Sequence, residues 1–155
     1  MKKRGARFKT KRDPDAFRRA IGGVAYIDDS QQVELGVAYR MAYEALKTGS
    51  GVESHFHTLA CTANIALVMC ERGFGTDYMD DAIKAQDAIV RCFARSKSTD
   101  RYLLDGDGIS SIARLLELHD AQLEISTNGD LRRTVDEVYK RINARMPGHQ
   151  VMELV

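Results

Sequence analysis

The 155-residue sequence has no tryptophan and only two prolines, a composition that argues against an all-β fold. It has three cysteines, an odd number with no two close together, so the disulfide framework of a small secreted domain is not expected. These cysteines fit a reducing, cytoplasmic setting better. The absences therefore favour an ordinary intracellular globular protein.

Long apolar segments are also lacking. The longest run without a charged residue is Thr58–Cys70, whose 13 residues are too few to span a bilayer as a helix. The first twelve residues, MKKRGARFKTKR, have no apolar stretch behind their charges and do not resemble a signal peptide. With 44% hydrophobic and 29% charged residues, the chain is expected to form one soluble domain over residues 13–155.

The formal net charge of +1 conceals an uneven distribution of charge along the chain. Residues 1–12, here called the basic arm, contain seven cations and no acid: Lys2, Lys3, Arg4, Arg7, Lys9, Lys11 and Arg12. The other 143 residues contain 16 basic and 22 acidic side chains, a net charge of −6. The basic arm indicates a segment that meets a polyanion, or else a solvated tail that aids solubility or pairs with the acidic body.

A short helix is predicted directly after the basic arm. Asp13 is a suitable N-cap, Pro14 suits the first helical position, and the pair Gly22-Gly23 ends the helix. Its apolar side chains share one face: Phe17, Ala20 and Ile21. A helix of about two turns is marginally stable alone, so we expect it to pack on the rest of the domain.

Helical spacing of apolar residues predicts five further helices and no strand. Their approximate ranges are 30–47, 52–72, 77–95, 109–123 and 131–146, with a loop at 96–108. In the first of these, Val33, Val37 and Met41 are expected to widen the buried stripe. The helix at 52–72 is apolar on most sides, which predicts a position at the centre of the bundle.

Caps and turns complete this prediction. Asp29 or Ser30 is expected to cap the helix at 30–47, and Asp107 the helix at 109–123. The predicted fold class is all-α, a compact bundle of five to six helices with a flexible basic N-terminal arm.

Metal-binding and catalytic patterns are scarce. Glu53, His57 and Cys61 share a helix face, but a metal would need further ligands such as His119 or Cys92. The simpler interpretation is that Glu53 and His57 pair and that the cysteines are apolar and inert. His119 and the mid-helix Asn64 are expected to be buried and hydrogen-bonded. No acid–base, nucleophile or metal constellation can be assembled, so we expect no catalytic residue, no metal, no cofactor and no enzyme activity.

The basic arm is the most distinctive feature of the sequence. Its cations suit contact with a phosphate backbone of DNA or RNA, and Phe8 could stack on an exposed base. A second basic cluster is predicted near the end of the helix at 77–95 and in the loop after it: Arg91, Arg95, Lys97 and Arg101. The two clusters could form one surface. No segment matches a helix-turn-helix, so the predicted binding is independent of base sequence.

Three segments of the chain resemble a group of mobile-element proteins. Leu35–Leu46, HTLACTANIAL at 57–67 and ERGFG at 71–75 are similar to small helical proteins of phages and mobile elements of proteobacteria, some of them labelled Fis-like regulators. The resemblance covers residues 30–125. It implies an accessory protein that acts by binding, as regulators of transcription and inhibitors of host defence, including anti-CRISPR proteins, do.

Two functions from different classes therefore remain. The first is a nucleic-acid-binding accessory protein that uses the basic arm. The second is an inhibitor of a host protein or nucleoprotein complex, whose acidic body occupies a basic channel on its target. Asp77, Asp80 and Asp81 form the acidic cluster chosen to represent that body. Either kind of protein could form a homodimer, to which the apolar tail 151–155 could contribute.

Overall fold

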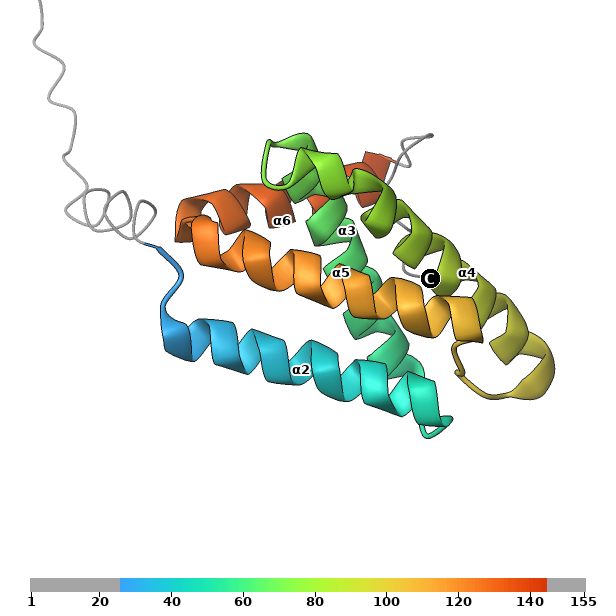
Figure 1. The fold of residues 1–155 in the computed structure, drawn as a ribbon. Helices are drawn as coiled ribbons and strands as arrows, with labels where there is room; N and C mark the ends of the chain where they lie inside the picture. Colours follow the sequence, from blue (N-terminus) through green and yellow to red (C-terminus); the bar gives the residue numbers. More distant parts are fainter. Residues whose placement is uncertain (1–25, 145–155) are drawn as a thin grey trace, which may run out of the picture.

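The computed structural model describes residues 26–144, and this part of the chain is all-α. It contains α2 (Asp29–Thr48), α3 (Glu53–Glu71), the 3-10 turn η1 (Thr76–Tyr78), α4 (Met79–Thr99), α5 (Gly106–Ile125) and α6 (Asn128–Ala144) (Figure 1). The predicted all-α bundle of five to six helices is confirmed over these residues. The basic arm, the predicted helix at 13–23 and the tail at 151–155 lie outside the described residues. None of the helices described is long and apolar enough to cross a membrane.

Helix α3 is the centre of the bundle, as its apolar faces predicted. It packs against α2, α4, α5 and α6, and in Figure 1 it passes behind α5. Leu59, Ala63 and Leu67 along its length are completely buried. Burial of apolar side chains along this helix by its four neighbours stabilises the bundle.

A tyrosine and an arginine of α2 hold this helix on α5. The hydroxyl of Tyr39 donates to the carboxylate of Asp120, and the guanidinium of Arg40 pairs with the same carboxylate. Burial, together with the neighbouring Asp120, raises the pKa of Tyr39 to about 12. The hydroxyl therefore stays protonated and remains a donor at neutral pH.

The solvent-facing side of α2 differs from the prediction. Val33, Val37 and Met41 do not widen the buried stripe, because their side chains are 63%, 51% and 63% exposed. The buried residues of α2 lie on the opposite side: Gly36, Tyr39, Ala42 and Leu46. Helix α2 lies at the edge of the bundle, where α3 and α5 cover one side of it. We call Val33, Val37 and Met41 the outward ridge.

The turn between α2 and α3 packs closely against the loop between α4 and α5. The amide of Leu104 donates to the carbonyl oxygen of Leu46 at 2.9 Å, and Gly51 forms a bridge with Tyr102. A Cβ atom on Gly51 would lie 2.3 Å from Leu46 Cδ2 and 2.9 Å from the carbonyl oxygen of Tyr102. Glycine is therefore required there by the close approach of the two segments.

The loop predicted at 96–108 is too long. Helix α4 continues to Thr99, and within it the hydroxyls of Ser96 and Thr99 donate to the carbonyl oxygens of Phe93 and Arg95, both at 2.7 Å. These polar residues thus bond within the helix instead of ending it. Asp100 ends it in the left-handed region, with φ 54°.

The caps of α2 and α5 also differ from the prediction. Asp28, not Asp29 or Ser30, caps α2 and forms a capping box with Gln31. Helix α5 begins at Gly106, and its cap is Asp105 instead of Asp107, with the amide of Gly108 donating to Asp105 Oδ1 at 2.6 Å. Each cap lies one or two residues earlier than expected, because both helices begin before their first apolar residue.

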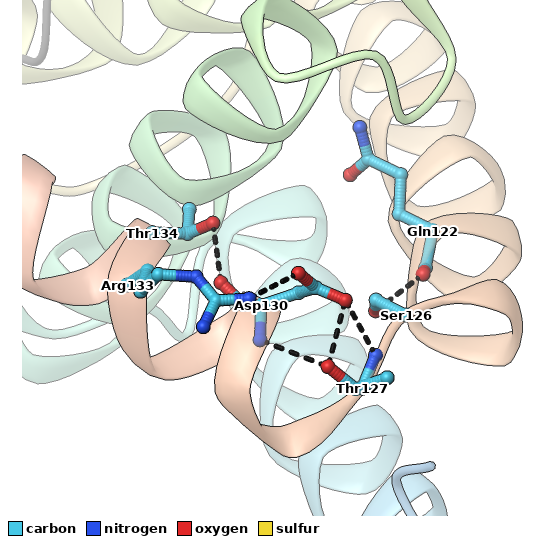
Figure 2. A network of polar contacts seen from close by, with 6 residues as sticks. All are labelled: Gln122, Ser126, Thr127, Asp130, Arg133 and Thr134. Atoms are coloured by element: carbon cyan, nitrogen blue, oxygen red, sulfur yellow. Dashed lines mark hydrogen bonds and ion pairs between the residues drawn. The ribbon is translucent and has the colours of Figure 1, made fainter. Parts of the chain in front are cut away.

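The start and the last turn of α6 are each fixed by polar contacts. Thr127 and Asp130 exchange hydrogen bonds at the helix start, and Arg133 donates to Asp130 at 2.7 Å (Figure 2). Further along, Arg141 donates to Glu71 of α3 at 2.5 Å. Because this arginine side chain is 17% exposed, its ion pair is largely shielded from solvent and ties α6 to the central helix.

Candidate functional site

The second basic cluster lies where α4 ends, and one of its members is already neutralised. Arg91 donates to Asp105 through both Nε, at 2.9 Å, and Nη2, at 3.3 Å. This hydrogen bond lowers the pKa of Asp105 and keeps the pair charged at neutral pH. Arg91 is therefore committed to the cap of α5 and is a weaker candidate for phosphate contact than the sequence suggested.

The other three cations of the cluster are exposed. Arg95 donates to the carbonyl oxygen of Leu103 at 2.5 Å, and Lys97 lies 4.6 Å from the ring centroid of Phe93. Neither contact neutralises the charge, because a carbonyl oxygen and an aromatic ring carry no net charge. Arg101 follows the end of α4.

The end of α2 adds another cation to this region. A Cβ atom built on Gly49 would lie 2.7 Å from Arg101 Nη2, so the arginine lies directly over the turn that follows α2. Lys47, in the last turn of α2, is 3.4 Å from Glu44 in an exposed ion pair that contributes little stability. We call Lys47, Arg95, Lys97 and Arg101 together the basic end of the body.

The described chain begins at the opposite end of α2. Tyr26 is the first described residue, and it bridges to Thr127 at the start of α6. Helix α2 has 20 residues and is therefore about 30 Å long. The described residues do not by themselves bring the arm and the basic end together, so their union into one surface remains a prediction.

The acidic cluster is only partly available to a partner. Asp77 in η1 and Asp80 at the start of α4 are exposed, whereas Asp81 is half-buried and lies 3.9 Å from Arg114 of α5. The charge of Asp81 is thus partly compensated within the chain. Of the three acids in the cluster, Asp77 and Asp80 are therefore the two that are exposed to a partner.

Sequence reasoning missed an apolar pocket beside these acids. It has a volume of about 560 Å³ and lies between η1 and the second half of α5. Tyr78 and Ile125, both largely exposed, stand in its wall together with Gly75, Leu118 and Ala121. Its residues come from two segments that are far apart in the chain, so no pattern within either segment predicted the pocket. Pockets of this size with a few polar groups are typical of binding sites.

A buried glutamine holds the two walls of this pocket in place. The carboxamide nitrogen of Gln122 donates to the carbonyl oxygens of Ala66 and Phe74, at 3.0 and 2.9 Å. Its Oε1 lies 3.3 Å from Nδ1 of His119. Gln122 thus fastens α5 to α3 and to the turn after it. The sequence showed a glutamine on α5 but not its partners.

The histidine and cysteine candidates have the surroundings of structural residues. His57 Nε2 lies 3.6 Å from Glu53 Oε1, so the two side chains are neighbours as the spacing predicted. They form no hydrogen bond at this distance, and the buried Nε2 has no hydrogen-bond partner among the described residues. Burial raises the pKa of Cys61, Cys70 and Cys92, to about 11 for Cys70, and this disfavours the reactive thiolate. Within residues 26–144, no three His, Cys, Asp or Glu side chains are grouped to hold a metal ion.

The buried polar predictions are confirmed. His119 is 4% exposed, and burial lowers its pKa, so the ring is neutral at pH 7. Asn64 is completely buried and accepts a hydrogen bond from Gln86 at 3.0 Å.

Comparison with known proteins gives no relative. No protein-family model, curated protein or solved structure matches this chain. The charges of the chain are therefore the main guide to function. The described residues 26–144 carry 13 basic and 19 acidic side chains, so the body has a net charge of −6, opposite in sign to the basic arm.

Proposed function

We propose that the protein is a non-enzymatic accessory protein that binds DNA or RNA through its basic arm. The observation that carries the proposal is the separation of charge, +7 in residues 1–12 against −6 in residues 26–144. A negatively charged body repels a phosphate backbone, so attraction is concentrated in the arm and at exposed cations. Contacts of this kind position a protein on nucleic acid without reading its bases.

The basic end of the body supports this function as a second point of contact. Lys97 and Arg101 are exposed, and neither forms an ion pair among the described residues. The three thiols Cys61, Cys70 and Cys92 are free, as is usual in a reducing cytoplasm, where we place the protein. A phage or mobile-element regulator that works beside nucleic acid fits both features.

A second candidate function rests on a different observation. The apolar pocket opens between the exposed side chains of Tyr78 and Ile125, with Asp77 and Asp80 nearby in the sequence. The lining also includes the acids Asp81 and Glu117 and the cation Arg114. An apolar anchor with acids beside it suits a partner protein with a basic surface, as an inhibitor of a host nucleoprotein complex would require. This function would use the body and leave the basic arm secondary.

A binding titration separates the two functions. Labelled single-stranded DNA, duplex DNA and RNA of mixed sequence are titrated with the full chain and with a variant lacking residues 2–12, at 50 and 200 mM salt. If the arm neutralises six phosphates, the affinity of the full chain should fall on the order of 10³-fold between these salt concentrations. The shortened variant should lose binding and keep its helical circular dichroism.

Absence of binding by the full chain would refute the nucleic-acid function. The inhibitor function would then be tested with the variants Ile125→Gln and Asp77→Lys/Asp80→Lys. These substitutions change exposed side chains and should abolish capture of a host partner without unfolding the body. Val90→Gln, a substitution of an exposed valine on α4, is the matched control.

A further inference from the structure

The apolar pocket between η1 and α5 has a charged end and an apolar end. Along α5 its lining begins with Arg114 and Glu117 and continues with Leu118, Ala121 and Ile125. The last three lie on one face of the helix, and the two charged residues are one turn nearer its start. The helix rises about 12 Å from Glu117 to Ile125. A ligand that fits this lining is therefore elongated, with a charged group at one end only.

The wall of the pocket opposite α5 is the turn that leads into η1, and hydrogen bonds hold this turn in place. The amide of Phe74 donates to the carbonyl oxygen of Met69 at 2.9 Å. The hydroxyl of Thr76 donates to the carbonyl oxygen of Cys70 at 2.8 Å. Gln122 joins the same turn to α5 by donating to the carbonyl oxygen of Phe74. The two walls therefore keep their spacing without a ligand, which lowers the entropic cost of binding one.

Gly75 leaves space between the two walls. Its φ of 78° lies in the left-handed region, which favours glycine. A Cβ atom built on it would lie 3.1 Å from Leu118 Cδ1 and 3.8 Å from Tyr78 Cδ2. Any other residue would therefore place its side chain between the ring of Tyr78 and α5. The backbone of the turn, and not only the position of movable side chains, creates this space.

The charges around the pocket are mostly negative. Asp81 and Glu117 line it with one cation, Arg114, which lies 3.9 Å from Asp81 and has a side chain that is 68% exposed. Glu117 is exposed and forms no ion pair within residues 26–144. The exposed acids Asp77 and Asp80 are close to the pocket in the sequence. A cation at the charged end is therefore attracted, whereas an anion is repelled.

The ring of Tyr78 adds a second attraction for a cation. Its side chain lines the pocket and is 59% exposed. Within the described part of the chain, this ring takes part in no aromatic or cation–π contact. An ammonium group within about 6 Å of the centre of an aromatic ring is attracted by the face of the ring. An available tyrosine ring beside carboxylates thus suits an organic cation.

We propose that this pocket binds a small organic cation, an ammonium group joined to an apolar or aromatic body. The body lies against Leu118, Ala121 and Ile125, and the ammonium group lies at the end that contains Glu117. The volume of about 560 Å³ is within the range of about 300–1,000 Å³ that is usual for small-molecule sites. None of the lining residues belongs to the basic end, so the proposal does not rest on nucleic-acid binding. It gives the pocket a small molecule in place of the partner protein considered above.

Three probes that share one apolar body test the ligand class. At neutral pH 4-phenylbutylamine is a cation, 4-phenylbutanol is neutral and 4-phenylbutyrate is an anion. Each probe is titrated into the isotope-labelled full chain at 50 mM salt and followed by amide NMR spectra. The amine should shift the amide signals of Gly75, Ala121 and Ile125. It should bind about fivefold more tightly than the alcohol and about 20-fold more tightly than the carboxylate, with smaller differences at 200 mM salt.

Substitutions of exposed side chains test the charged end while leaving the body folded. Glu117→Gln should reduce the preference for the amine over the alcohol about threefold and leave the affinity for the alcohol unchanged. Glu124→Gln removes the same charge from α5 outside the pocket, and it should change this preference much less. Tyr78→Leu keeps an apolar wall without an aromatic ring, so it should weaken the amine more than the alcohol.

Substitution of Ile125 tests the apolar end. Ile125→Gln replaces an exposed side chain and should weaken all three probes by a similar factor, about fivefold. Val90→Gln, a substitution of an exposed valine outside the pocket, should leave the three affinities unchanged. Titration of nucleic acid with Ile125→Gln should match that of the unmodified chain, so this experiment and the test of the proposed function give separate answers.

Three results would overturn the proposal. The first is the absence of shifts in the pocket amides with the amine at millimolar concentration. The second is equal binding of the three probes, or an equal effect of Glu117→Gln and Glu124→Gln, because the pocket would then not select a cation. The third is capture of a host protein that Ile125→Gln abolishes, together with no binding of the amine, because the pocket would then belong to a protein interface.

Discussion

Gln86 of α4 donates a hydrogen bond from its carboxamide nitrogen to Asn64 Oδ1 of α3, at 3.0 Å, inside the core. Asn64 is completely buried and Gln86 is 7% exposed, so the contact is shielded from water. A buried amide needs partners, and these two residues supply them to each other across the helix pair with the most extensive contact, α3 and α4. The contact therefore favours one register of α4 on the central helix.

Replacement of Asn64 tests this relationship. Asn64→Ala removes the acceptor of Gln86 and leaves a small cavity, so the free energy of unfolding should fall by about 2–3 kcal/mol. Urea denaturation of Asn64→Ala, Gln86→Ala and the double variant measures the loss. The two single losses should sum to more than the loss of the double variant, because the pair is removed only once. Additive losses would show that the two amides are not coupled.

The segments that form helices could be predicted from the sequence, because the spacing of apolar residues is a local property. The stripe on residues 52–72 indicated a central helix, and α3 occupies that position with Leu59 and Leu67 fully buried. Boundaries were less predictable, since Ser96 and Thr99 look like loop residues until their bonds to the preceding turn are known. The burial of α2 could not be predicted either. That helix has apolar side chains on two sides, and only its neighbours decide which side is covered.

The candidate site was harder to predict from the sequence than the helices were, because its contacts depend on tertiary structure. The cations Arg91 to Arg101 were visible in the sequence, but the pairing of Arg91 with Asp105 depends on how the loop after α4 returns to the helix. The apolar pocket joins Tyr78 to Ile125, which are 47 positions apart, and has no signature in either segment alone.

The stability of the fold should decrease in mild acid because His119 is buried in its neutral form. Burial lowers its pKa below the ordinary value, and its ring lies edge-on to Tyr39 and near Gln122 and Asp120. The unfolded chain gains a proton below about pH 6.5 while the folded chain does not, so the free energy of unfolding should fall as the pH falls through this range. Urea denaturation between pH 7 and 5 measures the slope.

His119→Gln provides the control for this pH dependence. The variant has no titrating ring, so its unfolding free energy should be flatter between pH 6.5 and 5 than that of the original chain. The lowered pKa of Asp105 and of Asp130 affects stability only at more acidic pH, below about 4, as these carboxylates become protonated. Equal slopes for the two proteins would mean that His119 is not responsible.

Two glycines should respond in opposite directions to alanine. Gly51→Ala places a methyl group 2.3 Å from Leu46 Cδ2 and 2.9 Å from the carbonyl oxygen of Tyr102, so the loop must shift, at a cost of about 1–3 kcal/mol. Gly106→Ala meets no atom within 4 Å at the start of α5 and should raise the unfolding free energy by about 0.4–1 kcal/mol. Thermal melting of both variants measures the difference. A stable Gly51→Ala protein would show that the two loops are not in close contact.

Asp105 has two roles that can be separated by mutation: it caps α5, and it neutralises Arg91 beside the basic end. Asn caps a helix about as well as Asp, so Asp105→Asn should retain the cap while releasing Arg91 from its ion pair. Loss of one negative charge beside the basic end should strengthen binding to duplex DNA about fivefold at 50 mM salt, with a smaller effect at 200 mM. Asp105→Ala should show the same gain in affinity and lose about 1 kcal/mol of stability with the cap.

The matched control for this last prediction is Asp136→Asn, which removes one exposed acid from α6, an element outside the basic end. It should change the affinity for DNA much less than Asp105→Asn does, since screening weakens its effect on phosphates bound at the end of α4. Equal gains in the two variants would mean that DNA responds only to the net charge of the body. A gain confined to Asp105→Asn would place a phosphate beside Arg91.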